Sequence, residues 1–163
     1  MYLKMLVIVF IILSSFSIAL AAPVEVSITP DFQNVEIGQD LIINISIDPN
    51  NNPITGAQFN LLFNSSVLEI DSINEDNLFR QNGSDTAFNS GVLNNSDGTL
   101  INVWGLITMP GANVTSKGTL VTIKMITLEA GISPLKVKNV IISDTYGRSV
   151  QVHSINGTVE VIE

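Results

Sequence analysis

The chain has 163 residues, with 7 Lys and Arg against 15 Asp and Glu, and a formal net charge of −8. Nucleic-acid binders need clustered cations to displace counterions from phosphate, and this acidic chain has no basic stripe. It contains one His and no Cys, which excludes disulfides, thiolate zinc sites, iron–sulfur clusters, a Cys nucleophile and a His-rich metal site. The length is that of a single domain.

The N-terminal segment has the features of an export signal. A single cation, Lys4, precedes an unbroken apolar run at 5–13, and the segment ends in the small-residue pattern Ala19-Leu20-Ala21. We predict a signal peptide at 1–21, cleaved after Ala21 or, alternatively, after Ala22, and a mature domain at 22–163 with a net charge of −9 from 6 basic and 15 acidic residues. An uncleaved anchor is the rival, because the run is just long enough to span a bilayer. Membrane contact is expected only in that case.

Six Asn-x-Ser/Thr sequons suit an exported protein, secreted or held at the cell surface. An Asn-rich chain also produces sequons by chance, so each is only a candidate glycan acceptor. The candidates are Asn64, Asn82, Asn94, Asn113 and Asn156, with Asn44 the weakest because it lies within a predicted strand.

After the signal, the chain reads as many short strands separated by turns. Apolar and polar residues alternate with period two, and no segment keeps a helical period over ten residues. A helical turn is expected only at 75–79. The predicted strands are 24–28, 35–37, 41–47, 57–63, 67–73, 86–89, 99–107, 121–125, 135–137, 140–142, 150–152 and 158–162. This pattern predicts an all-β, two-sheet sandwich or jelly roll with no second domain.

Four segments, in order, resemble the cohesin domain family. They are VEVSITPDFQNVEIGQDLIINISI at 24–47, ITGAQFNLLFNSSVLEIDSI at 54–73, GTLVTIKM at 118–125 and NVIISDTYGRSVQVHSINGTVEV at 139–161. Together they cover nearly all of the mature chain. The resemblance implies a nine-stranded jelly-roll β-sandwich that binds a dockerin, a pair of calcium-loop helices carried by the partner protein. Calcium is then expected on the partner, and this chain needs no cofactor. Cohesins of this type assemble cellulosomes, which degrade polysaccharides.

A partner-binding face follows from the alternation of two strands. We assign Ala57, Phe59, Leu61 and Phe63 to the core, so Gln58, Asn60 and Leu62 point outward. In 99–107, the β-branched set Ile101, Val103 and Ile107 reads as core, which turns Leu100, Asn102, Trp104 and Leu106 outward. The alternative is a bulge at Gly105 with Trp104 in the core.

The resemblance places dockerin on the strands 58–62, 86–89 and 99–107. Gln58 stands where many cohesins carry an Asp. The side-chain amides of Asn60, Asn89 and Asn102 would then supply the hydrogen bonds to the partner instead. The predicted partner-binding residues are Gln58, Asn60, Leu62, Asn89, Asn102, Trp104 and Leu106.

Catalytic patterns are weak. His153 has no recognisable Ser-His-Asp context and is read as a surface residue. The carboxylates Glu69, Asp71, Glu75 and Asp76 are as close in sequence as an acidic chain makes them anyway, so they do not indicate a glycosidase pair. Calcium at Asp76, Asp85, Asp97 or Asp144 is a minor hypothesis, because the ligand spacing of an EF-hand is absent.

Three functions remain open from the sequence. The first is a secreted, non-catalytic module that captures a dockerin-bearing protein. The second is a carbohydrate-binding module, which the aromatic content of 6% disfavours, because sugars stack on several coplanar rings. The third is a structural adhesion domain of the cell surface.

Overall fold

The computed structural model describes residues 22–163, and the predicted signal peptide at 1–21 lies outside the described residues. Twelve strands and one short 3₁₀ helix make up this part of the chain. They are β1 (Val24–Thr29), β2 (Phe32–Glu36), β3 (Asp40–Asp48), β4 (Ile54–Leu62), β5 (Leu68–Glu75), η1 (Leu78–Arg80), β6 (Thr86–Asn89), β7 (Val92–Asn94), β8 (Thr99–Ile107), β9 (Gly118–Thr127), β10 (Gly131–Asp144), β11 (Val152–Ile155) and β12 (Gly157–Ile162).

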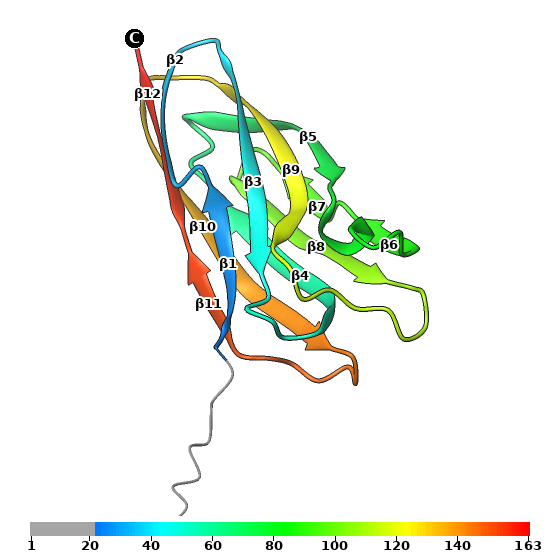
Figure 1. Cartoon of the computed structure of the whole chain (residues 1–163). Coiled ribbons are helices and arrows are strands. Elements are labelled where there is room, and N and C mark those ends of the chain that lie inside the picture. Colours follow the sequence, from blue (N-terminus) through cyan, green and yellow to red (C-terminus); the bar gives the residue numbers. More distant parts are fainter. Residues whose placement is uncertain (1–21) are drawn as a thin grey trace, which may run out of the picture.

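The strands form two sheets packed face to face, which confirms the predicted all-β sandwich. One sheet has the order β11-β1-β3-β9-β5, and the other has the order β2-β12-β10-β4-β8-β6 with β7 also paired to β8. In Figure 1 the sheet of β1, β3, β9 and β5 lies in front of β10, β4 and β8. The chain repeatedly crosses between layers, so strands that pair within a sheet come from distant parts of the sequence. The outer face of the second sheet therefore combines β4, β8 and β10.

The core lies between the inner faces and consists largely of alternating apolar strand positions, although it also contains Leu100, which was expected to face outward. Burying one such side chain contributes roughly 1.5–3 kcal/mol to folding. Ala57, Phe59, Leu61 and Phe63 are all buried, as expected. The largest fully buried side chains are Ile28, Ile43, Ile45, Ile47, Ile54, Phe59, Leu61, Leu68, Leu78, Leu100, Leu120 and Ile123.

Several details of the strand prediction are wrong, among them β7, which was not expected, and the strand expected at 150–152, which is found at Val152–Ile155. The nine strands implied by the resemblance are twelve within residues 22–163, because short segments such as β7 and β11 also pair. The expected strands 135–137 and 140–142 are one strand, β10, in which a register shift between Lys138 and Ile141 absorbs the irregular residues. The helical turn expected at 75–79 is the 3₁₀ helix at 78–80.

Candidate partner-binding face

The outer face of the second sheet is organised in cross-strand rows. Residues paired across neighbouring strands point to the same side of a sheet. Gln58 of β4 pairs with Ile141 of β10 on one side and with Trp104 of β8 on the other, and Trp104 pairs with Asn89 of β6. The strand register thus places Ile141, Gln58, Trp104 and Asn89 in one row, although the neighbours Gln58 and Ile141 are more than eighty residues apart in the sequence.

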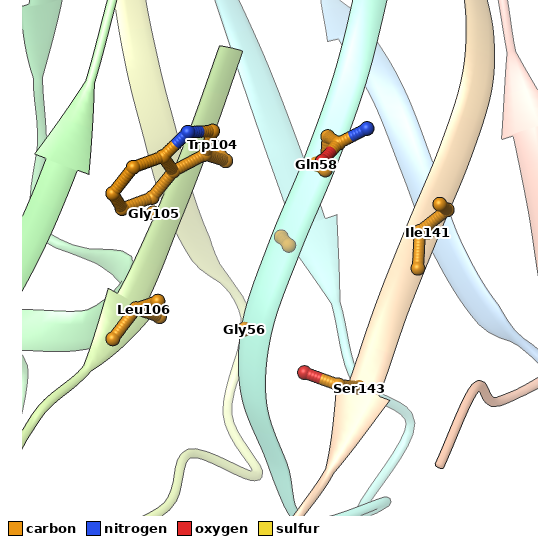
Figure 2. A pocket seen from close by; sticks show the side chains of 8 residues that line it. Gly56, Gln58, Trp104, Gly105, Leu106, Ile141 and Ser143 are labelled. Atoms are coloured by element: carbon orange, nitrogen blue, oxygen red, sulfur yellow. The ribbon is translucent and has the colours of Figure 1, made fainter. Parts of the chain in front are cut away.

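The neighbouring row contains a hollow. Gly56 pairs with Ser143 and with Leu106, and it has no side chain to fill the space between them. The hollow has a volume of about 300 Å³ and is lined by Gly56, Ala57, Gln58, Trp104, Gly105, Leu106, Ile141 and Ser143. Figure 2 shows Trp104 and Leu106 on one side of Gly56, with Ile141 and Ser143 on the other. A Cβ built on Gly56 would lie 2.7 Å from the Ser143 hydroxyl oxygen, so the hollow depends on glycine at this position.

A local irregularity in β8 decides which of its residues face outward. Asn102 has a positive φ of 58°, and the β4–β8 register shifts between Phe59 and Leu61. The backbone N–H of Asn102 donates to the Asn60 side-chain oxygen over 2.9 Å. One extra residue therefore stands on β8, and the side-chain alternation changes phase there.

This bulge corrects part of the predicted alternation. Leu100, expected to face outward, is fully buried, while Ile101, expected in the core, is 39% exposed. Val103 is buried as predicted. The bulge lies at Asn102 rather than at the alternative position, Gly105, which pairs regularly with Ala57. Sequence reasoning missed the phase change because nothing in the apolar pattern marks Asn102 as a left-handed residue.

The structure brings all seven predicted partner-binding residues to this one face. Gln58, Asn60, Leu62 and Trp104 are half-buried, whereas Asn89, Asn102 and Leu106 are exposed. We call the outward residues of β4, β6, β8 and β10 the docking face. Beyond the predicted seven it includes Gly56, Ala87, Ile101, Lys136, Lys138, Ile141 and Ser143.

Strand β10 supplies the members that the sequence analysis missed. Ile141 is 50% exposed beside Gln58, while Lys136 and Lys138 stand opposite Leu62 and Asn60. The alternation of buried Leu135 and Val137 with the two lysines indicates that both lysines point outward, but not that they lie beside β4. These residues were missed because the sequence analysis divided β10 into two short strands, 135–137 and 140–142.

Three of the four carboxylates considered as catalytic candidates are engaged in structural contacts. Glu75 pairs with Arg80 and accepts a hydrogen bond from Thr86, while Asp71 lies 3.5 Å from the Lys124 ammonium. Asp76 accepts from the Thr122 hydroxyl over 2.8 Å. Glu69 is half-buried within β5. These separate contacts hold neighbouring strands together.

Two ionisable groups have shifted pKa values from such contacts. The Asp40 carboxylate, 2.8 Å from Lys124, accepts its hydrogen bond and raises the pKa of that ammonium, with a smaller contribution from Asp71. The backbone N–H of Arg148 donates to Asp144 over 2.9 Å and lowers the pKa of that carboxyl, helped by the Arg148 guanidinium and the Tyr146 N–H. Both groups thus stabilise the sandwich in their charged forms.

The only histidine of the chain lies apart from the docking face. His153 is exposed on β11, at the edge of the other sheet. Within residues 22–163, no three His, Asp or Glu side chains are grouped where they could hold a metal ion. The same part of the chain has no helix long and apolar enough to span a membrane.

The sequons fall mainly between strands. Asn64 lies two residues after the end of β4, Asn94 ends β7 and Asn156 separates β11 from β12, while Asn82 and Asn113 lie in loops. Asn44 is half-buried in the middle of β3, with its side-chain oxygen 2.9 Å from the Thr122 hydroxyl oxygen.

Comparison with solved structures shows the same fold in several proteins. A non-cellulosomal cohesin from the archaeon Archaeoglobus fulgidus is 19% identical, with a TM-score of 0.65 over 87% of this chain and 93% of that one. The Clostridium thermocellum complex of Coh-OlpA with Doc918 gives 17% identity and a TM-score of 0.69, over 86% of this chain and 100% of that one. A type II cohesin domain from the cellulosome of Acetivibrio cellulolyticus gives 13% identity and a TM-score of 0.67, over 85% of this chain and 95% of that one.

Sequence comparison identifies the family. No curated protein sequence matches the chain at a significant level. The family model for the cohesin domain matches residues 25–161, which is nearly the whole of the described chain. The chain therefore belongs to the cohesin domain family.

Proposed function

We propose that this chain is a non-catalytic protein-binding module that captures a dockerin-bearing partner on its docking face. The observation that carries the proposal is the apolar centre of that face, formed by Trp104, Leu106 and Ile141 around the hollow at Gly56. Leu106 is 37% and Ile141 50% exposed. A contiguous apolar area rimmed by amides is the usual composition of a modest protein interface.

The related structures support a dockerin as the partner. Coh-OlpA and the sixth cohesin of scaffoldin B from Acetivibrio cellulolyticus were both solved in complex with dockerins. Calcium then belongs to the partner's loops, and the cohesin side contributes only side chains of the sheet. The assembly proposed here is cellulosome-like and serves polysaccharide degradation. The Archaeoglobus relative is described as non-cellulosomal, so the scaffold around the module can differ.

We further propose that the module works outside the cell, secreted or at the cell surface. The sequence of residues 1–21 supports export, with cleavage after Ala21. The intact mass of the exported protein tests this directly. A mass beginning at Ala22, plus any glycan on Asn64, Asn82, Asn94, Asn113 or Asn156, supports it, and retention of 1–21 contradicts cleavage.

A binding assay tests the function itself. Immobilised 22–163 is offered calcium-loaded dockerins encoded in its own genome, and separately cellulose. We expect capture of a dockerin and loss of capture after chelation, because the calcium loops of the partner unfold. Retention on cellulose without any dockerin binding would instead indicate a carbohydrate-binding module, and binding to neither would leave the adhesion role.

A further inference from the structure

The basic residues of this acidic chain differ in whether they form ion pairs. Residues 22–163 contain six, of which Arg80, Lys124 and Arg148 form ion pairs with carboxylates. Within these residues, Lys117, Lys136 and Lys138 have no ion-pair partner. Two of these three lysines stand two positions apart on β10, so they point outward together on the docking face.

The carboxylates are distributed in the opposite way. Strands β4, β6, β7 and β8 contain no Asp or Glu, and the only one in β10 is the buried Asp144, which is paired with Arg148. Asp97, in the turn before β8, accepts from the Asn94 amide, and Glu160 stands on β12 opposite Ile132. A domain with a net charge of −9 thus turns a cationic and apolar surface toward its proposed partner.

The two parts of the face lie at different positions along the same strands. The apolar centre is at the rows of Gly56 and Gln58, whereas Lys138 and Lys136 follow at the rows of Asn60 and Leu62. A partner that meets both parts can do so in only one direction along β4 and β10. Charge here would therefore fix the partner's orientation as well as its identity.

We propose that the surface captured by the docking face is an acidic–apolar protein surface, which places Asp or Glu carboxylates against Lys136 and Lys138 and apolar side chains against Trp104, Leu106 and Ile141. This inference rests on the proposed function and specifies the chemistry of the partner. Ammonium–carboxylate hydrogen bonds are stronger than neutral ones, and unpaired lysines are free to form them. The carboxylates steer the encounter through their charge, and the apolar contacts set the lifetime of the complex.

An acidic polysaccharide would also carry carboxylates, but the centre of the face does not suit one. Sugar rings stack on flat aromatic side chains, whereas Leu106 and Ile141 are aliphatic and Trp104 is the only Trp of the chain. Branched aliphatic side chains pack best against other apolar side chains. The observations therefore favour a protein.

A display experiment tests the inference. The probe is a library of calcium-loaded Doc918 from Clostridium thermocellum, with its exposed helix positions randomised among acidic, basic, polar and apolar residues. It is selected against the wild-type chain, against the double variant Lys136→Glu with Lys138→Glu, and against the matched control Lys117→Glu, an exposed unpaired lysine outside the face. All substitutions are at exposed positions, so folding is unaffected, which the melting temperature verifies.

We expect Asp and Glu to be enriched in binders of the wild type and of Lys117→Glu, and Lys and Arg in binders of the double variant. For a selected acidic binder, the double variant should lower the association rate constant at least about tenfold at low ionic strength, and Lys117→Glu less than about twofold. Binders without acidic enrichment, or the same residues selected by all three chains, overturn the inference while leaving dockerin capture intact.

Two other outcomes are separable from that one. If no library member binds any of the three chains, dockerin capture itself fails, and the inference fails with it. If polygalacturonate is retained by the wild type and released by the double variant while no library member binds, the face recognises an acidic polysaccharide instead. Either result overturns the proposal.

Discussion

The backbone N–H of Asn102 donates a hydrogen bond to the side-chain oxygen of Asn60, across 2.9 Å between two neighbouring strands. Asn102 has a φ of 58°, a conformation that costs most residues free energy but that Asn tolerates. This hydrogen bond therefore links the bulge of β8 to the neighbouring strand β4. Beyond the bulge, regular pairing resumes, with Trp104 opposite Gln58. The position of Trp104 on the docking face depends on this one irregular residue.

Asn60→Ala removes the acceptor of that hydrogen bond. We expect the free energy of unfolding to fall by about 1 kcal/mol, as for one lost hydrogen bond, and partner affinity to fall as well because β8 loses its fixed register. Chemical denaturation and calorimetric titration measure the two effects. Asn102→Gly is the matched control, since glycine adopts the positive φ and keeps its N–H, so its stability should be within about 0.5 kcal/mol of the wild type. Equal losses in both variants would contradict this account of the bulge.

Trp104→Ala tests the apolar centre of the docking face. Affinity for a bound dockerin should weaken by more than about 1 kcal/mol, because large side chains at the centre of an interface dominate its energy. The melting temperature should change little, since Trp104 is only half-buried and lies outside the core. Ile42→Ala, at a 54% exposed apolar residue of the opposite sheet, should leave binding unchanged. A large loss of melting temperature in Trp104→Ala would assign this residue to the core.

Substitution of Gly98, in the turn before β8, tests whether the close backbone contact at this turn requires glycine. Gly98 has a φ of 64°, and a Cβ at this position would lie 2.1 Å from the Phe63 carbonyl oxygen. Gly98→Ala should therefore lower the free energy of unfolding by more than about 2 kcal/mol, since neither backbone segment can move freely. Gly83→Ala has a similar φ of 71° with open space around the Cβ, and it should cost only the conformational strain of about 1 kcal/mol. Denaturation midpoints of the two variants compare them, and equal costs would show that the steric contact at Phe63 does not matter.

The pH dependence of stability tests the contact between Asp144 and Arg148. The donated hydrogen bonds lower the pKa of Asp144 in the folded state relative to its ordinary value. The carboxylate therefore contributes stability above its ordinary pKa, and this contribution is lost as the pH falls through the lower folded-state pKa. Between about pH 5 and pH 2, the melting temperature of the wild type should fall more steeply than that of Asp144→Asn. Parallel curves would rule out this linkage.

Sequence reasoning identified the fold and half of the residues of the docking face because both depend on period-two alternation. Where strands are regular, as at 57–63, each side chain went to the correct side of the sheet. The alternation failed at Asn102, where a backbone irregularity changes the phase without altering the apolar pattern. For that reason the expected orientations of Leu100 and Ile101 are the reverse of the observed ones.

The contribution of β10 depends on tertiary pairing, which one sequence does not reveal. Lys136, Lys138 and Ile141 join the docking face only because β10 pairs with β4, more than seventy residues earlier in the chain. The hollow at Gly56 likewise requires Leu106 of β8 and Ser143 of β10 to lie on either side of Gly56 in β4. No local pattern in the sequence indicates these neighbours.

The central claim is that one sheet face of this cohesin domain holds its partner, and amide hydrogen exchange measures that most directly. Exchange is recorded for 22–163 alone and saturated with a calcium-loaded dockerin that it captures. The account predicts slower exchange in β4, β8 and β10, centred on Gln58 and Trp104, with β1, β3 and β9 unchanged. Slower exchange confined to β1, β3 and β9 would place the partner on the wrong sheet and contradict the account.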